Sequence, residues 1–208
     1  NTTTGDILYA PDLGDYGGHQ YPFQGLLQDR AEIGFEANPY YFVAFPCGTV
    51  YLPEILAPNS VTAIGGPYIT IRVLDAVGHT PARFYGGMTD GVNTMLFLNP
   101  DKGYEFLLRP AGDEPTLILT DSPAPGVEGL GYRVGQGELI HLTIEDYARQ
   151  LYNLNYGRAG RTELFGIASP AASVRIQEAE GLLQSADDAY RSRQYDRWYS
   201  SSLLAWGV

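Results

Sequence analysis

The stretch that decides the fold class is TMLFLNPDKGYEFLLR, residues 94–109. Two short runs of mostly apolar residues, 94–98 and 104–109, flank the turn sequence NPDKG at 99–103. Pro, Asp and Gly favour tight turns because each suits a backbone conformation that turns require. The pattern predicts two β-strands joined as a hairpin.

Segments of the same kind continue on both sides of this stretch. Residues 68–75 read YITIRVLD, in which polar Thr70 and Arg72 alternate with apolar residues, as in a strand with one buried face. Further strands are expected at 40–45, 49–52, 60–64, 82–85, 116–120 and 139–143. Short strands separated by Gly- and Pro-rich turns indicate an antiparallel β-sandwich or barrel-like domain, which we expect to cover residues 1–142.

The pattern becomes helical from residue 143 onwards. Thr143 and Asp146 make a capping-box pair that starts a helix, and apolar residues follow at helical spacing to about Leu154. The Asn, Gly and Arg residues at 155–161 are expected to end this helix. The fold class is therefore mainly β with an α appendage, a helical segment at 143–208 that packs on the β-rich domain.

An αα-hairpin is expected within this segment, at about residues 170–206. Ser169 and Pro170 are typical of a helix start, a short turn follows at 191–194, and another helix begins at Tyr195. The hairpin resembles one tetratricopeptide-like unit through its small and aromatic residues, which are Ala186, Ala189, Tyr190, Tyr195, Ser202 and Ala205. The usual Gly ahead of Tyr195 is missing and no second copy follows, so we expect a packing appendage rather than a peptide-binding repeat.

The charge of the chain limits the kinds of partner. The net charge is −11, and residues 1–142 hold most of it, with 6 basic against 16 acidic residues, whereas residues 143–208 hold 7 against 8. An acidic surface repels phosphate backbones and anionic lipid headgroups. We therefore expect no binding to nucleic acid, and binding to membrane surfaces is disfavoured. The expected partner is a protein or a carbohydrate.

Standard catalytic signatures are absent from the sequence. There is no Gly-x-Ser-x-Gly elbow, no phosphate-binding loop, no His-Glu-x-x-His and no Cys-x-x-Cys. The single cysteine, Cys47, lies in an apolar run, so we expect a buried thiol. Paired carboxylates for glycoside cleavage stay open as an alternative, because the chain has 24 acidic residues and no pattern selects a pair.

A Gly-rich loop near the N-terminus is the first candidate binding site. Aromatic rings with a hydroxyl suit stacking on sugars and contacts with proteins. The candidate ligand-binding residues of this loop are Asp12, Asp15, Tyr16, His19 and Tyr21. The two carboxylates could also bind calcium through oxygen ligands, but their spacing matches no EF-hand loop. We therefore assign no metal site, and calcium is the only cofactor considered.

Aromatic residues at the C-terminal end form the second candidate site. Trp198, Tyr199 and Trp206 are expected to pack the hairpin on the β domain, or to contact a partner where they are exposed. The chain starts without Met, and its last helix becomes more apolar toward Val208. We expect a piece of a longer, envelope-associated protein, with room for a membrane span after Val208.

The leading functional hypothesis is a non-catalytic, extracytoplasmic binding or interaction domain whose ligand is a carbohydrate or a protein. One alternative is a saccharide-acting hydrolase that uses paired carboxylates. The other is a structural domain that supports a membrane or assembly partner. Two carboxylates about 5–10 Å apart in a cleft would favour the hydrolase. A flat or shallow face lined by Tyr would favour binding, and exposed Trp198 and Trp206 would favour the structural domain.

Overall fold

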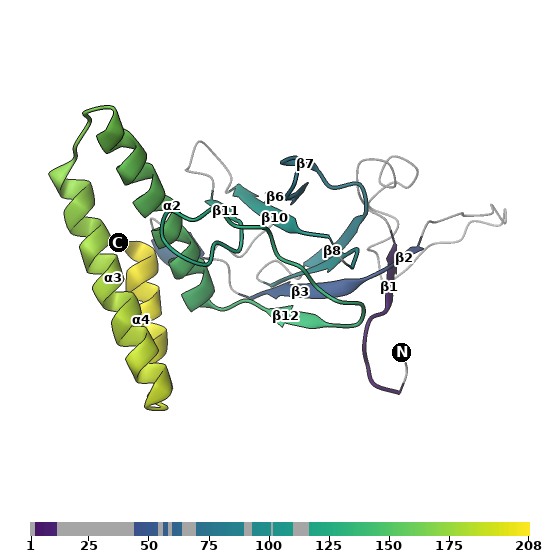
Figure 1. Cartoon of the computed structure of the whole chain (residues 1–208). Coiled ribbons are helices and arrows are strands. Elements are labelled where there is room, and N and C mark those ends of the chain that lie inside the picture. Colours follow the sequence, from purple (N-terminus) through teal and green to yellow (C-terminus); the bar gives the residue numbers. More distant parts are fainter. Residues whose placement is uncertain are drawn as a thin grey trace.

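Two four-stranded β-sheets, two short two-stranded sheets and three C-terminal helices form the secondary structure of the described part of the chain (Figure 1). The computed structural model describes residues 3–11, 44–53, 56–57, 60–63, 70–89, 93–100, 102–109 and 117–208. The strand orders are β11-β10-β6-β7 in one sheet and β12-β3-β9-β8 in the other. The prediction of a mainly β fold with a helical appendage is confirmed.

The first sheet is antiparallel throughout. Its strands are β6 (Thr70–Asp75), β7 (Thr80–Pro81), β10 (Tyr104–Arg109) and β11 (Leu117–Leu119). The side chains of Phe106 and Leu108, two positions apart on β10, both lie in the core, as expected for a strand with one buried face. Glu105 points to the opposite face and is nevertheless buried, which the alternation does not predict.

The second sheet mixes parallel and antiparallel pairs. Its strands are β3 (Gly48–Leu52), β8 (Tyr85–Thr89), β9 (Thr94–Leu98) and β12 (Leu139–His141), and β12 runs parallel to β3. Buried residues of both sheets contribute to one core, which includes Val50, Leu52, Val73, Leu96, Leu98, Phe106 and Leu119. This shared core makes the two sheets a sandwich.

A smaller apolar cluster surrounds the single cysteine. Cys47 is fully buried with Ala10, Phe45 and Phe97, so the expected burial of the thiol is confirmed. Burial raises the pKa of the Cys47 thiol. Two short antiparallel pairs complete the β part, namely β1 (Tyr9–Pro11) with β2 (Ala44–Pro46) and β4 (Leu56–Ala57) with β5 (Ser60–Ala63).

The predicted hairpin at 94–109 is wrong. β9 belongs to the second sheet and β10 to the first, so the chain passes between the sheets from Leu98 to Tyr104. Turn-forming residues predict where a chain reverses, but not which strands pair. Tyr104 instead exchanges two backbone hydrogen bonds with Tyr132, at 3.0 and 2.8 Å. The predicted strand at 82–85 is also displaced, because β7 ends at Pro81 and β8 begins at Tyr85.

The three helices are α2 (Ile144–Leu164), α3 (Pro170–Arg191) and α4 (Tyr195–Gly207). The capping box is present, because the Asp146 N–H donates to Thr143 Oγ1 and the Thr143 N–H donates to the Asp146 carboxylate. α2 continues past the expected end at Leu154. Isolated glycines lower helix stability by only about 1 kcal/mol each, so Gly157 and Gly160 do not stop it.

Polar contacts attach α2 to the β sandwich. The Tyr147 hydroxyl donates to the Pro53 carbonyl at 3.2 Å, and the side-chain amides of Gln150 and Asn153 donate to the Ser122 carbonyl at 3.2 and 3.0 Å. All three helical side chains are buried. Within the described ranges, no helix is long and apolar enough to cross a membrane.

Candidate interaction surface

The first candidate site cannot be placed. Its residues lie outside the described part of the chain, and they are Asp12, Asp15, Tyr16, His19 and Tyr21. The two carboxylates considered for calcium, Asp12 and Asp15, are among these residues, so the calcium hypothesis also concerns a part of the chain outside the described ranges. Among the residues that the structure does describe, no group of three or more His, Cys, Asp or Glu side chains is arranged to hold a metal ion.

The second candidate site divides into a buried and an exposed part. Trp206 is only 2% exposed, and its ring packs at a tilt on Tyr147 with 6.1 Å between centroids. Trp206 is therefore a packing residue and not a part of the exposed surface, because its indole fills the contact between α4 and α2. Trp198 is half-buried, and Tyr199 is 40% exposed.

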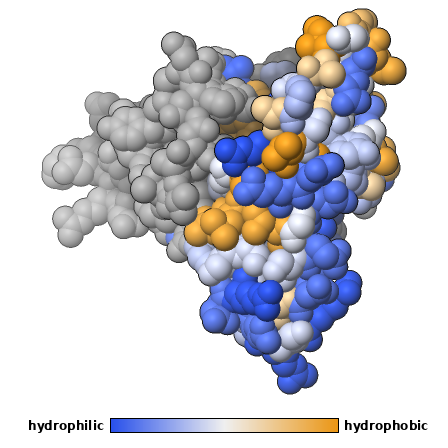
Figure 2. All heavy atoms as spheres, turned by 90° about the vertical axis from the view of Figure 1, so that its left-hand side faces the viewer, coloured by the Kyte–Doolittle hydropathy of each residue, from blue (hydrophilic) through white to orange (hydrophobic). Residues whose placement is uncertain are grey.

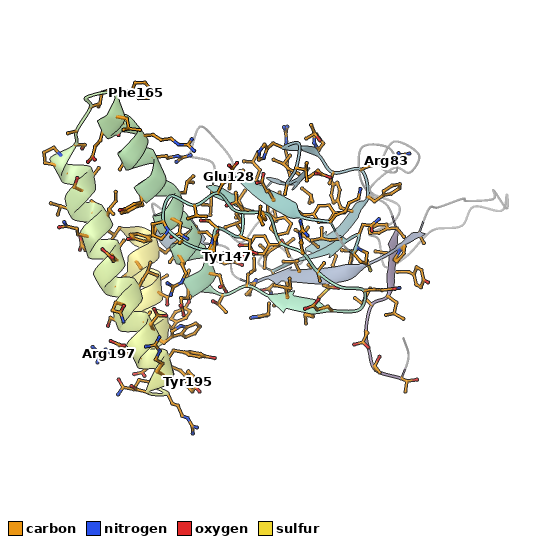
Figure 3. The ribbon with its side chains drawn as sticks, in the orientation of Figure 1. Arg83, Glu128, Tyr147, Phe165, Tyr195 and Arg197 are labelled. Atoms are coloured by element: carbon orange, nitrogen blue, oxygen red, sulfur yellow. The ribbon has the colours of Figure 1, made fainter. Side chains whose placement is uncertain are left out.

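The exposed part continues around the turn from α3 to α4. We call it the aromatic–arginine corner, and it consists of Tyr190, Arg191, Arg193, Tyr195, Arg197, Trp198 and Tyr199. Tyr190 and Tyr195 are each 57% exposed and meet edge to face, with 6.0 Å between centroids. Tyr190 also contacts the Trp198 ring at 5.9 Å. Figure 3 shows Tyr195 and Arg197 at the lower end of the helices, pointing away from the molecule.

Backbone hydrogen bonds fix the turn that builds this corner. The N–H of Arg193 donates to the Tyr190 carbonyl at 3.0 Å, and the N–H of Gln194 donates to the Ala189 carbonyl at 2.8 Å. These two bonds, with a left-handed residue between the helices, are those of a Schellman motif. The motif satisfies the last carbonyls of α3 and places Tyr190 and Tyr195 side by side.

Arg193 holds an unfavourable backbone conformation in this turn. Its φ is 57°, a left-handed value that disfavours residues with a Cβ by roughly 1–2 kcal/mol, and glycine is the usual residue at this position. Its side chain is exposed. Neither Arg193 nor its neighbours Arg191 and Arg197 form an ion pair with another described residue.

A partly buried polar network adjoins the corner and joins all three helices. The Trp198 indole N–H donates to Glu145 Oε2 at 2.5 Å. Arg149 Nη2 donates to Glu145 Oε1 at 2.6 Å and to Asp187 Oδ1 at 2.9 Å. Glu145 and Arg149 lie on α2, Asp187 on α3 and Trp198 on α4, so the network fixes the orientation of the Trp198 ring against Tyr190.

The network predicts a pH dependence of stability. Burial by itself would raise the pKa of Glu145, but the hydrogen bonds from Trp198 and Arg149 outweigh it and lower the pKa overall. A carboxylate with a depressed pKa stabilises the fold above its ordinary pKa of about 4.3, and this contribution is lost as the pH falls through the depressed value. Glu145→Gln should therefore destabilise the protein at pH 6 and differ much less from wild type at pH 3.

Urea denaturation at pH 3, 4, 5 and 6 measures this convergence. Glu163→Gln is the matched control, because Glu163 is exposed on the same helix. Its difference from wild type should be small at every pH. A Glu145→Gln difference that does not change with pH would show that the charge of Glu145 contributes nothing to the network.

A second group of titratable residues lies on the β part. His79 Nδ1 is 2.9 Å from a carboxylate oxygen of Glu105, and His79 Nε2 is 3.9 Å from one of Glu128. The hydrogen bond with Glu105 raises the pKa of His79. Glu105 is 1% exposed and Glu128 is 81% exposed at the side chain. Because Glu105 is buried behind the imidazole, this pair does not offer the two accessible carboxylates that glycoside cleavage requires.

Sequence reasoning selected Trp198 and Tyr199 but not the arginines beside them. The signal is present as RSRQYDRWY at 191–199, which alternates basic and aromatic residues around a turn. Arg, Tyr and Trp are the residues most enriched where binding energy concentrates in protein interfaces. Glu145 was missed because it is 53 positions from Trp198 along the chain.

Comparisons with known proteins give no family for this chain. Neither protein-family models, nor curated proteins, nor solved structures match it. The resemblance of the hairpin to a tetratricopeptide-like unit therefore rests on its residues and on the antiparallel arrangement of α3 and α4 alone. The candidate function follows from the surface residues.

Proposed function

We propose that the chain is a non-catalytic interaction domain that binds a protein partner through the aromatic–arginine corner. The observation that carries this proposal is the set of exposed tyrosines beside three arginines that form no ion pair with a described residue. Tyr and Trp provide large contact area with few rotatable bonds, and Arg donates several hydrogen bonds in a fixed geometry.

The strain at Arg193 gives independent support. Residues held in unfavourable backbone regions concentrate at functional sites, where the side chain is needed despite the conformational penalty. The Arg193 side chain is exposed and has no ion pair with another described residue that would explain its presence. A contact outside the chain is a direct reason for an arginine at a position that suits glycine.

The corner favours a protein with acidic groups over a carbohydrate. A sugar stacks on the open face of an aromatic ring, whereas Tyr190 already contacts Tyr195 and Trp198. Arginine forks match carboxylates in geometry and charge. The partner surface is therefore expected to present Asp or Glu side chains around an apolar centre.

An affinity capture with matched variants tests the proposal. Immobilised wild-type chain is compared with Tyr195→Ala/Arg197→Ala in extracts of the source organism, and retained proteins are quantified by mass spectrometry. Tyr9→Ala/Arg133→Ala is the control, because it removes the same residue types from exposed positions on the β part. The proposal expects a protein retained by wild type and control and lost from the corner variant. Equal retention of that protein by wild type and both variants would refute the proposal.

Arg193→Gly should raise the stability of the chain and weaken its binding to the partner. Glycine relieves the left-handed strain but adds freedom to the unfolded chain, so a net stabilisation of about 0.5–1 kcal/mol is expected. Binding to the captured partner should fall at the same time. Thermal denaturation and a binding assay on the same preparation measure both effects. A variant that is less stable than wild type would contradict the strain at this position.

Other ligands and roles are open to direct tests. A carbohydrate ligand and an extracytoplasmic location stay predictions. The saccharide-acting hydrolase and the structural support domain stay alternatives. A panel of oligosaccharides in a thermal-shift assay tests the carbohydrate ligand directly, because a ligand at a hundred times its Kd adds about 2.7 kcal/mol of stability.

A further inference from the structure

The connection between α2 and α3 exposes apolar side chains that nothing in the described chain covers. Leu164 is 85% exposed, Phe165 is 83% exposed and Ile167 is 64% exposed. We call Leu164, Phe165 and Ile167 the α2–α3 tip. Figure 2 shows apolar atoms gathered at the upper end of the helices, where Figure 3 labels Phe165.

Hydrogen bonds within the turn pair the N–H groups of Gly166 and Ile167 at the tip. The N–H of Gly166 donates to the Glu163 carbonyl at 2.9 Å, and the N–H of Ile167 donates to the Thr162 carbonyl at 3.0 Å. Gly166 has a φ of 73°, so this turn is a second Schellman motif. At the start of α3, the side chain of Ser169 accepts from the N–H of Ala172. Internal pairing of these N–H groups lowers the free-energy cost of bringing the tip toward an apolar medium.

The charge near the tip differs from that of the whole chain. Residues 155–178 carry three arginines and two glutamates, a net charge of +1 in a chain of −11. Arg175 pairs with Glu178, whereas Arg158 and Arg161 are exposed and form no ion pair with any described residue. The first turn of α3 contains no acidic residue, so the positive end of its dipole also faces the tip. These charges complement an anionic surface.

The size and shape of the tip favour a bilayer over a protein. A stable protein interface buries about 800 Å² on each partner. Even aromatic side chains bury only about 150–250 Å² each, so three side chains on a projecting turn fall short of that area. A lipid interface needs no matching surface, because acyl chains and headgroups adapt to a convex shape.

We propose that the α2–α3 tip inserts Leu164, Phe165 and Ile167 into the interface of an anionic lipid bilayer, with Arg158 and Arg161 at the lipid phosphates. The acidic β part is repelled by such a surface, which orients the chain tip first. α3 has 22 residues and is about 33 Å long, so it keeps the aromatic–arginine corner at its other end in water. The proposal does not depend on the function proposed for that corner.

Binding of the full chain to extruded vesicles tests the proposal. One set of vesicles is phosphatidylcholine alone, and the other contains about two fifths phosphatidylglycerol. Wild type should float with the anionic vesicles in low salt and much less with the neutral ones. Leu164→Ser/Phe165→Ser should lower the partition coefficient by at least about tenfold, because two inserted side chains are lost.

Two further variants separate insertion from other causes. Val77→Ser/Leu130→Ser removes two apolar side chains that are 89% and 75% exposed elsewhere, and it should bind like wild type. Arg158→Gln/Arg161→Gln should bind anionic and neutral vesicles alike. Circular dichroism verifies that each variant is folded.

The outcomes that overturn the proposal are distinct. Wild type that stays with neither kind of vesicle contradicts it, and so does equal binding by wild type and the tip double variant. If the tip variant instead loses a protein in the affinity capture while vesicle binding is absent, the tip is a protein contact. Loss of vesicle binding leaves the corner proposal intact, because that proposal is tested with Tyr195 and Arg197.

Discussion

Replacing Trp206 with alanine is expected to lower the free energy of unfolding by about 3–5 kcal/mol, which is the usual range for a buried aromatic side chain. Trp206 is 2% exposed and packs on Tyr147, whose hydroxyl bonds to Pro53 next to β3. Loss of the indole therefore leaves a cavity between α4 and α2 and weakens the attachment of α2 to the sandwich. Urea denaturation followed by far-ultraviolet circular dichroism measures the change.

Two companion substitutions make this result specific. Leu204→Ala, at a 57% exposed position of the same helix, should change stability by no more than about 0.5 kcal/mol. Trp206→Phe should destabilise less than alanine does, because it keeps a ring and removes an indole N–H that has no acceptor among the described residues. If Trp206→Ala and Leu204→Ala behave alike, the helical segment does not depend on this contact.

Tyr195→Ala is expected to weaken binding of the captured partner by at least tenfold, about 1.4 kcal/mol or more. The ring is 57% exposed in the free chain, and its edge-to-face contact with Tyr190 holds it in place, so little freedom is lost on binding. Calorimetric titration measures the affinity. Tyr9→Ala, on β1, should change it less than twofold.

The arginines should act mainly through charge. Alanine at Arg191 or Arg197 is expected to change the association rate more than the dissociation rate. It should also weaken the dependence of the association rate on salt, because exposed charges steer the encounter. Tyr190→Ala with Tyr195→Ala should not be additive, since the two rings touch. Additive effects with no change in salt dependence would contradict a contact at this corner.

Local signals in the sequence predicted the local structure well. The capping pair at Thr143 and the start at Ser169 depend on neighbouring residues, the burial of Cys47 is indicated by the apolar run around it, and the structure confirms all three. The mainly β class followed from strand spacing in the same way. These features depend on short-range chemistry that one sequence contains in full.

Pairings between distant residues could not be predicted. The turn at 99–103 predicted a hairpin, but β10 pairs with β6 and β11, which are distant along the chain from this turn or follow a further loop. The ring of Trp198 is oriented by Glu145 on α2, and the burial of Trp206 depends on Tyr147. The sequence alone therefore does not distinguish a buried aromatic residue near a chain end from an exposed one.

Site-specific photo-crosslinking from position 195 tests the proposed binding surface most directly. A photoreactive phenylalanine analogue replaces Tyr195 in one preparation and Tyr9 in another, because both tyrosines are exposed, at 57% and 63%. Irradiation in extracts of the source organism should join the partner to the chain from position 195 and not from position 9. Crosslinks of equal yield from both positions, or from position 9 alone, would show that the corner is not where the partner binds.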